Sequence, residues 1–229
     1  MAMRDWVKLP STWIERGGLR SLSWKHGGAG SDGIAALMAL TVIAHAADSD
    51  TGVARITYDS ICNLTGLSRA KLANGLEILR HIEVVEAGPY DARSTYKLVG
   101  YDATKGWAKF PAKRMYLHSR IIAFDDLRLR KVTELDALKL FFLFVARRGN
   151  DTNLANIGYD KIEEYTGIKR IRIKTAISFL ASLSLVYVEH IQSRINPNGV
   201  SSAYRIVGID SYNHMGTRAR NFEETDLTV

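Results

Sequence analysis

A dense group of hydrogen-bond donors lies between residues 169 and 178 of this 229-residue chain. The stretch reads KRIRIKTAIS. Its basic and hydroxyl members are Lys169, Arg170, Arg172, Lys174, Thr175 and Ser178. Lysine and arginine donate to phosphate oxygens and to guanine, and hydroxyls bind phosphate or base edges. The chemistry that these residues can perform is therefore the recognition of an anionic partner.

Helical spacing divides this stretch into two faces. At 100° per residue, the residues Ile173, Ala176, Ile177 and Leu180 fall together on a core side. Ile171, Lys174, Thr175 and Ser178 fall opposite, with Lys169 at the amino end and Arg170 and Arg172 on the flanks. A helix that enters the major groove needs this pattern, and an outward isoleucine can pack on a thymine methyl. The alternative is an ordinary solvated basic face.

The same stretch has a counterpart earlier in the chain. Residues 50 to 79 align with residues 151 to 180 at a constant offset of 101, with 11 identities in 30 positions. The sequence WVKLP at 6 to 10 returns as WAKFP at 107 to 111, again at that offset. The sequence YKLVGYD at 96 to 102 returns as YRIVGID at 204 to 210, where the offset has grown to 108. This expansion predicts a variable loop late in each repeat.

The counterpart helix keeps the register but differs in chemistry. Its predicted core side is Leu72, Gly75, Leu76 and Leu79, and its outward side is Ala70, Ala73, Asn74 and Glu77. The candidate DNA contacts here are Ser68, Arg69, Lys71 and Asn74, of which Asn74 can read adenine. Glu77 repels phosphate unless it accepts from cytosine. The helix is therefore either a selective reader or a surface for protein contact.

Each repeat predicts the same order of elements. An extended segment at 6 to 10 and a glycine-rich connector at 25 to 32 lead to an apolar helix over 33 to 47, matched by 133 to 147. A short helix follows from Thr57 to Gly66, and a second from Ser68 to about His81. Two strands then form a hairpin, at 84 to 87 and 95 to 100, and later at 185 to 191 and 203 to 209. Arg93 and Arg194 lie in the two hairpin loops, where they can contact the minor groove or the backbone.

The repeated pattern Y-D-x-I-x-x-x-T-G-[LI]-x-R, at Tyr58 to Arg69 and Tyr159 to Arg170, resembles the helix-turn-helix of winged-helix DNA-binding proteins. Two such units in tandem are most similar to the replication initiator proteins of bacterial plasmids, which bind repeated sites at an origin. The resemblance implies an α+β, mainly α fold, with two winged helix-turn-helix domains related by internal duplication. The expected domains are residues 1–104 and 105–210, followed by a tail at 211–229.

Composition favours a polyanionic partner. The net charge is +7, and residues 106 to 229 carry +6 of it, because they hold 19 Lys and Arg against 13 Asp and Glu. A single cysteine, Cys62, and the lack of a signal peptide or a long unbroken apolar run favour the bacterial cytoplasm and predict no membrane association.

A catalytic role has little support in the sequence. The segment from Lys25 to Asp32 lacks the Gly-Lys-Ser/Thr ending of a phosphate-binding loop. The six histidines show no metal-ligand spacing with one another. We therefore expect no catalytic residues, no metal and no cofactor.

The resulting expectation is a non-enzymatic, sequence-specific binder of double-stranded DNA, acting as the replication initiator of a plasmid or mobile element. Two joined recognition helices predict a bipartite site of roughly 20 base pairs. The resemblance also implies that the first domain can form a homodimer. A transcriptional repressor of the same fold is one alternative. Another is a tandem winged-helix structural subunit of a chromosome-organising complex.

Overall fold

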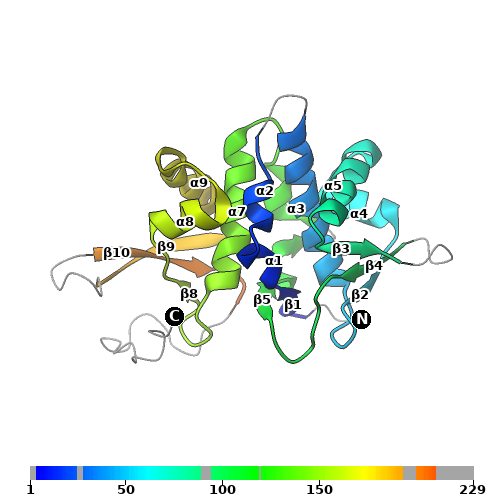
Figure 1. Ribbon diagram of the computed structural model, residues 1–229, viewed down its shortest axis with the longest axis horizontal. Coiled ribbons are helices and arrows are strands. Elements are labelled where there is room, and N and C mark those ends of the chain that lie inside the picture. Colours follow the sequence, from blue (N-terminus) through cyan, green and yellow to red (C-terminus); the bar gives the residue numbers. More distant parts are fainter. Residues whose placement is uncertain (1–3, 25–27, 89–93, 119, 193–199, 210–229) are drawn as a thin grey trace.

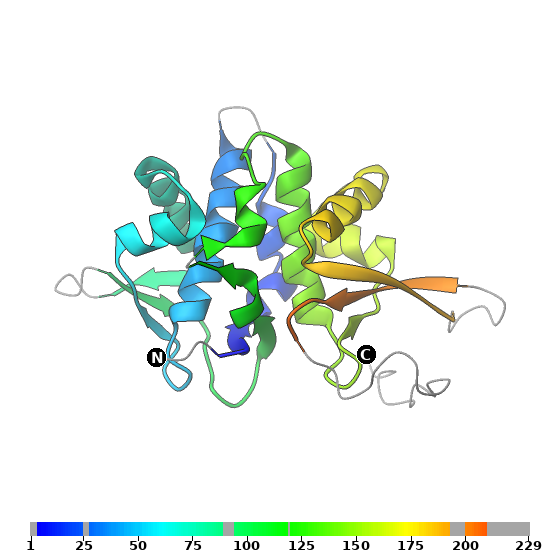
Figure 2. The same cartoon turned by 180° about the vertical axis from the view of Figure 1, so that it is seen from behind.

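The computed structural model describes residues 4–24, 28–88, 94–118, 120–192 and 200–209. The protein is a mixture of helices and strands, which confirms the α+β class. Two long helices, α3 (Ala29–Ala46) and α7 (Val132–Arg147), lie side by side at its centre. The elements of the first and second halves of the chain lie on opposite sides of this central pair (Figures 1 and 2).

On the side of the first half, two helices and a small sheet pack against α3. The helices are α4 (Tyr58–Thr65) and α5 (Arg69–His81), which agree with the predicted pair, including Thr57 and Ser68 as N-caps. The sheet has the order β2-β4-β3, from Val53–Arg55, Thr95–Leu98 and Val85–Ala87. The predicted hairpin is confirmed by the antiparallel β3 and β4, whereas β2 is a third strand that the sequence did not predict.

The second half repeats this order against α7. Helix α8 (Tyr159–Thr166) precedes α9 (Arg170–Ser182), and both start 101 residues after their counterparts. The sheet has the order β8-β10-β9, from Leu154–Ala155, Val200–Ile206 and Val186–Gln192. The seven-residue strands of this hairpin make it longer than that of the first half, which agrees with the late expansion of the offset.

Two strands join the halves. Strand β1 (Trp6–Pro10) pairs antiparallel with β5 (Trp107–Pro111), so the two repeated W-x-K-x-P segments bind each other. The rings of Trp6 and Trp107 stack with their centroids 5.9 Å apart. Buried side chains from both halves form one continuous hydrophobic core. The sequence division near residue 104 falls in the connection between β4 and β5.

The remaining short elements surround the junction between the halves. They are α1 (Thr12–Glu15), α2 (Gly18–Ser21), the 3₁₀ turn η1 (Lys113–Met115), β6 (Tyr116–Leu117), β7 (Arg120–Ile121) and α6 (Ile122–Asp125). The predicted tail at 211–229 lies outside the described residues.

The start of α3 corrects one prediction. The helix begins at Ala29, so residues 29 to 32 of the expected glycine-rich connector are helical. A β-carbon at Gly30 would lie 2.2 Å from the ring of Trp24, so the glycine is needed for this ring to pack against the helix. Asp32 adds a favourable negative charge to the first turn. By length and composition α3 is apolar enough to span a membrane, but 72% of that stretch is buried inside the protein.

Candidate nucleic-acid interface

The turn between the two short helices is built in the same way in both halves. The Thr65 hydroxyl donates to the Ile61 carbonyl at 2.7 Å and accepts from the Leu67 amide at 3.3 Å. The Thr166 hydroxyl makes the equivalent bonds, to the Ile162 carbonyl and from the Ile168 amide. Gly66 and Gly167 follow at φ of 73° and 68°, where a side chain would be strained. The repeated Thr-Gly pair therefore fixes the angle between the helices.

A second repeated contact involves two of the predicted DNA contacts, Arg69 and Arg170. Arg69 forms an ion pair with Asp59 and lies over the Tyr58 ring, 5.3 Å from its centroid. Arg170 forms an ion pair with Asp160 and lies over Tyr159 at 5.5 Å. All four charged groups are exposed, and such surface pairs contribute at most about 1 kcal/mol. Both arginines can therefore exchange their partner for another anion.

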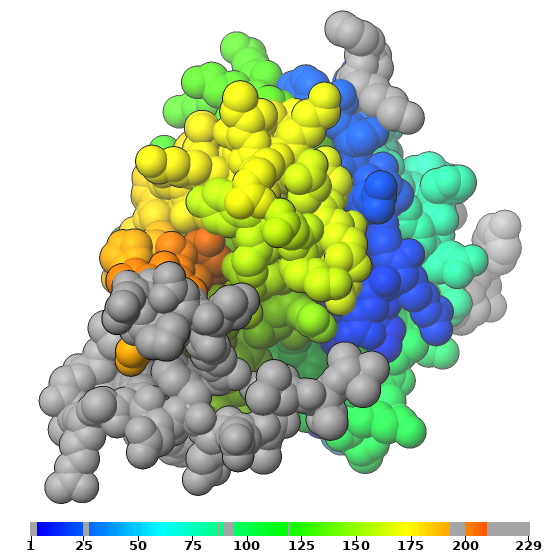
Figure 3. Space-filling model, turned by 60° about the vertical axis from the view of Figure 1, so that its left-hand side comes forward, coloured from blue at the N-terminus to red at the C-terminus, as the bar shows by residue number. Residues whose placement is uncertain are grey.

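The outward face of α9 agrees with the predicted division. Ile173, Ala176, Ile177 and Leu180 are buried, whereas Lys169, Arg170, Ile171, Lys174, Thr175 and Ser178 are exposed. Ile171 is 86% exposed, the highest value among the large hydrophobic side chains described. The hydroxyl of Ser178 donates to the Lys174 carbonyl at 3.0 Å, and this leaves its lone pairs free to accept. Helices α8 and α9 (yellow) cover much of the face in Figure 3.

Arg172 differs from its neighbours because it has a buried partner. Its Nε lies 3.1 Å from Oδ2 of Asp136 on α7, and its Nη2 lies 3.5 Å from Oδ1. Desolvation raises the pKa of Asp136, and the positive charges of Arg172 and Lys139 oppose that increase. Lys139 is itself buried and donates to the Leu22 carbonyl at 2.6 Å, and desolvation lowers its pKa to about 8.

In the first half, the candidate contacts of α5 are largely bonded within the protein. The Ser68 hydroxyl accepts from the Lys71 amide as an N-cap. The Lys71 ammonium donates to Asp32 at 2.7 Å and to Ser31 at 2.5 Å, and Asn74 donates to Asp32 at 3.3 Å. Of the predicted outward residues, Ala70, Ala73, Asn74 and Glu77 are all exposed. The face of α5 therefore offers fewer free cations than that of α9.

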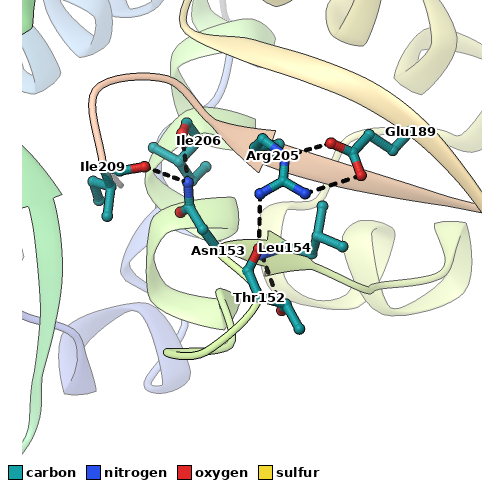
Figure 4. Close-up of polar contacts among 7 residues, drawn as sticks. All are labelled: Thr152, Asn153, Leu154, Glu189, Arg205, Ile206 and Ile209. Atoms are coloured by element: carbon teal, nitrogen blue, oxygen red, sulfur yellow. Dashed lines mark hydrogen bonds and ion pairs between the residues drawn. The ribbon is translucent and has the colours of Figure 1, made fainter. Parts of the chain in front are cut away.

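The base of the second hairpin is fixed by polar contacts that the sequence did not predict (Figure 4). Arg205 on β10 forms an ion pair with Glu189 on β9 and donates to the Thr152 carbonyl at 2.8 Å. Asn153 donates to the carbonyls of Ile206 and Ile209 at 2.8 and 2.7 Å. These bonds tie the hairpin to the turn between α7 and β8. Arg93 and Arg194, the predicted hairpin contacts, lie outside the described residues.

Within the described residues, neither a metal cluster nor the cavity at the junction involves α5 or α9. The described residues include no group of three or more His, Cys, Asp or Glu side chains that can hold a metal ion. A cavity of about 710 Å³ lies at the junction, and its lining includes Arg4, Val7, His45, Asp48 and Arg55. It lies apart from α5 and α9, since its lining comes from the end of α3, from β2 and the segment before it, and from residues in or beside β1 and β5.

The two outward helices occupy comparable positions in the molecule. Helices α5 and α9 lie on opposite flanks of the central pair, toward the same upper end of the view in Figure 1. The hairpins β3–β4 and β9–β10 extend outward below them. Neither a protein-family model nor a curated protein sequence matches this chain.

Proposed function

We propose that this chain binds double-stranded DNA in a sequence-specific way. In this proposal α4–α5 and α8–α9 are two helix-turn-helix units, and their hairpins are the wings of tandem winged-helix domains related by duplication. The observation that carries the proposal is the outward face of α9, where exposed Lys169, Lys174 and Ile171 stand above a buried apolar face. Cations bind phosphate and guanine, and an exposed isoleucine is suited to the thymine methyl.

The N-terminus of α9 supports this proposal. Its N-cap is Lys169, whose counterpart in α5 is Ser68, a residue that caps its helix with its hydroxyl. A lysine cannot accept the free amide hydrogens, and its charge is unfavourable at the positive end of a helix dipole. The second half therefore gives up helix stability at this position and presents an exposed cation instead.

The positions of α5 and α9 support a bipartite site. Two helices on opposite flanks, exposed toward one end of the molecule, can enter successive major grooves on one face of a duplex. We expect a site of roughly 20 base pairs, with most of the salt dependence coming from the second half. The proposed biological role is replication initiation on a plasmid or mobile element, in the bacterial cytoplasm and without enzymatic activity.

The outward side chains of α5 are bound within the protein, and this favours a role for the first half other than general attraction to DNA. Lys71 and Asn74 are bound to Asp32, and Glu77 is exposed on the same face. Such a helix can read a few bases selectively, or it can contact a second copy of the chain in a homodimer. Footprinting separates these roles, because dimerisation through the first half would leave only one protected half-site per chain.

The test is the selection of bound duplexes from random and host-derived DNA at two salt concentrations. We expect enrichment of a bipartite or repeated site, and its location beside an origin or a promoter decides between an initiator and a repressor. Salt-sensitive binding without enrichment would contradict the proposal and favour a structural subunit of a chromosome-organising complex.

A charge-matched pair of variants tests whether the outward face of α9 is the DNA-binding surface. Replacing Lys169 and Lys174 by alanine should lower the salt dependence, by about 0.9 in log–log slope for each phosphate that the protein no longer neutralises. The control replaces Arg16 and Lys105, which are exposed in the connections after α1 and before β5. The control variant should bind like the unmodified protein. Equal weakening of binding in the two variants would mean that only total charge matters.

A further inference from the structure

The third residue of each outward helix is bound to a carboxylate of the central helix pair. These residues are Lys71 on α5 and Arg172 on α9, which correspond at the offset of 101. Lys71 binds Asp32 on α3, and Arg172 binds Asp136 on α7. At the same offset, however, the counterpart of Asp32 is Thr133 and that of Asp136 is Ala35. The third residue of the outward helix is thus bound to an acid in both halves, but the two acids do not occupy equivalent positions in the repeat.

The geometry at Arg172 leaves part of its guanidinium available. Asp136 faces the edge formed by Nε and Nη2, at 3.1 and 3.5 Å. Both hydrogens of Nη1 and one of Nη2 remain, and that second edge can donate two parallel hydrogen bonds to O6 and N7 of guanine. The Arg172 side chain is 39% exposed while that of Asp136 is 3% exposed, so the pair has one buried and one accessible end.

The ion pair is also incomplete as a structural bridge. Among the described residues, neither Arg172 Nε nor Asp136 Oδ2 has a well-directed hydrogen bond, although both atoms are buried. Buried charged atoms without good hydrogen bonds lower the stability of a folded protein. Their presence here therefore points to a role other than stability. The ion pair confines the guanidinium beside the groove-facing surface without satisfying all of its donors.

The charge of Asp136 changes what Arg172 contributes. Next to a carboxylate, Arg172 adds little net attraction to phosphate, so it is not a general anchor for any DNA sequence. A confined guanidinium loses less freedom on binding than a mobile one, and this favours a directional contact to one base. The same argument applies to Lys71 and Asn74, which are both held by Asp32.

We infer that Asp136 is a positioning residue for base recognition, holding Arg172 so that its free edge reads a guanine in the site of the second half. Asp32 does the same for Lys71 and Asn74 in the first half. The two acids then increase sequence selectivity while lowering affinity for arbitrary DNA. This inference rests on the proposed function, because it concerns how the same two helices distinguish bases.

The experiment compares base preference in three proteins: the unmodified chain, Asp136→Asn and Arg172→Lys. Each is tested against the selected site, against that site with single base changes, and against an unrelated duplex. The unmodified chain should prefer guanine at one position by roughly 5- to 100-fold. Arg172→Lys keeps the positive charge but lacks the two parallel N–H donors of the guanidinium. Asp136→Asn removes the carboxylate that holds Arg172 in place. Both should lose the preference at that same position, and Asp136→Asn should bind the unrelated duplex as tightly or more tightly.

The double variant Asp136→Asn with Arg172→Lys should lose no more preference than either single variant, because the two residues act as a unit. Retention of the guanine preference in Asp136→Asn would overturn the inference. If the unmodified chain selects no site at all, it is the proposed function that fails. A purely structural role for Asp136 would lower the unfolding temperature and leave the base preference unchanged.

Two further variants cover a failure of Asp136→Asn to fold, since loss of the carboxylate removes the nearby negative charge that favours the buried Lys139 ammonium. Adding Lys139→Met removes this ammonium as well. Asp32→Asn tests the first half at a more accessible ion pair, where the acid is 16% exposed. Loss of a base preference in the first half-site supports the inference, and its full retention overturns it there.

Discussion

At the scale of single residues, identity between the two repeats coincides with structural contacts. Thr65 and Gly66 build the turn, and Tyr58, Asp59 and Arg69 connect its two helices, with the same contacts in the second half. The outward residues differ: Ser68, Ala70, Lys71 and Asn74 become Lys169, Ile171, Arg172 and Thr175. Shared residues therefore maintain the fold, and the differences between the helices set what each surface can bind.

The close contact between α3 and α5 depends on Gly75. A β-carbon there would lie 2.8 Å from the backbone atoms Ala35 C and Ala36 N. We expect Gly75→Ala to lower the free energy of unfolding by about 1 to 3 kcal/mol, because rigid backbone must move apart. Helix propensity alone would give the opposite sign, a gain of about 1 kcal/mol. Urea unfolding of the variant decides between the two, and a more stable protein would contradict the prediction.

At the scale of elements, the sequence predicted the parts with strong local signals. Helices α4 and α5 are bounded by Thr57, Gly66 and Ser68, whose chemistry is readable from the chain itself. Strands β2 and β8 were missed because they have only three and two residues, and their partners are distant in sequence. The acids that hold Lys71 and Arg172 were missed for the same reason, since tertiary packing alone brings α3 and α7 to those side chains.

The N-terminus of α9 provides a prediction in which stability and binding change in opposite directions. Lys169 has backbone angles close to those of Ser68, so a serine there can cap the helix without a change of conformation. We expect Lys169→Ser to raise the free energy of unfolding by about 1 kcal/mol, through the new cap and the removal of a cation. It should also weaken duplex binding.

The matched control for this prediction is Ser68→Ala, which removes the cap of α5 and should cost about 1 kcal/mol. Thermal unfolding and duplex titration of both variants are the measurements. Unchanged stability of Lys169→Ser would show that the lysine does not destabilise α9, and would remove one support for the proposed interface.

At the scale of the whole molecule, His45 is one of the residues that connect the halves. It lies near the end of α3, and its Nε2 and Nδ1 lie 2.8 Å from the Pro111 carbonyl and the Tyr116 hydroxyl. The carbonyl can only accept, so Nε2 carries the proton and Nδ1 accepts from Tyr116. The ring also packs against Phe110, with centroids 5.4 Å apart. A neutral histidine thus bonds to the second half with both nitrogens.

This arrangement predicts a pH-dependent junction. Burial lowers the pKa of His45 from 6.5 to about 4, while the bond to Pro111 opposes this decrease. A histidine with a lowered folded-state pKa stabilises the protein fully above pH 6.5. That contribution decreases as the pH falls toward 4, because the unfolded chain then binds the extra proton. The decrease in the free energy of unfolding is at most about 3 kcal/mol, given the difference between the pKa values of the folded and unfolded states.

Urea unfolding at pH 7, 5.5 and 4, for the unmodified chain and for His45→Gln, measures this effect. Glutamine has no proton to gain in this range. The free energy of unfolding of His45→Gln should therefore change less with pH, even if the variant is less stable than the unmodified chain at every pH. The comparison therefore uses the slope with pH, to which acidic residues contribute equally in both proteins. Parallel slopes would contradict the prediction, whereas a steeper slope for the unmodified chain would establish that His45 makes the junction between the halves acid-sensitive.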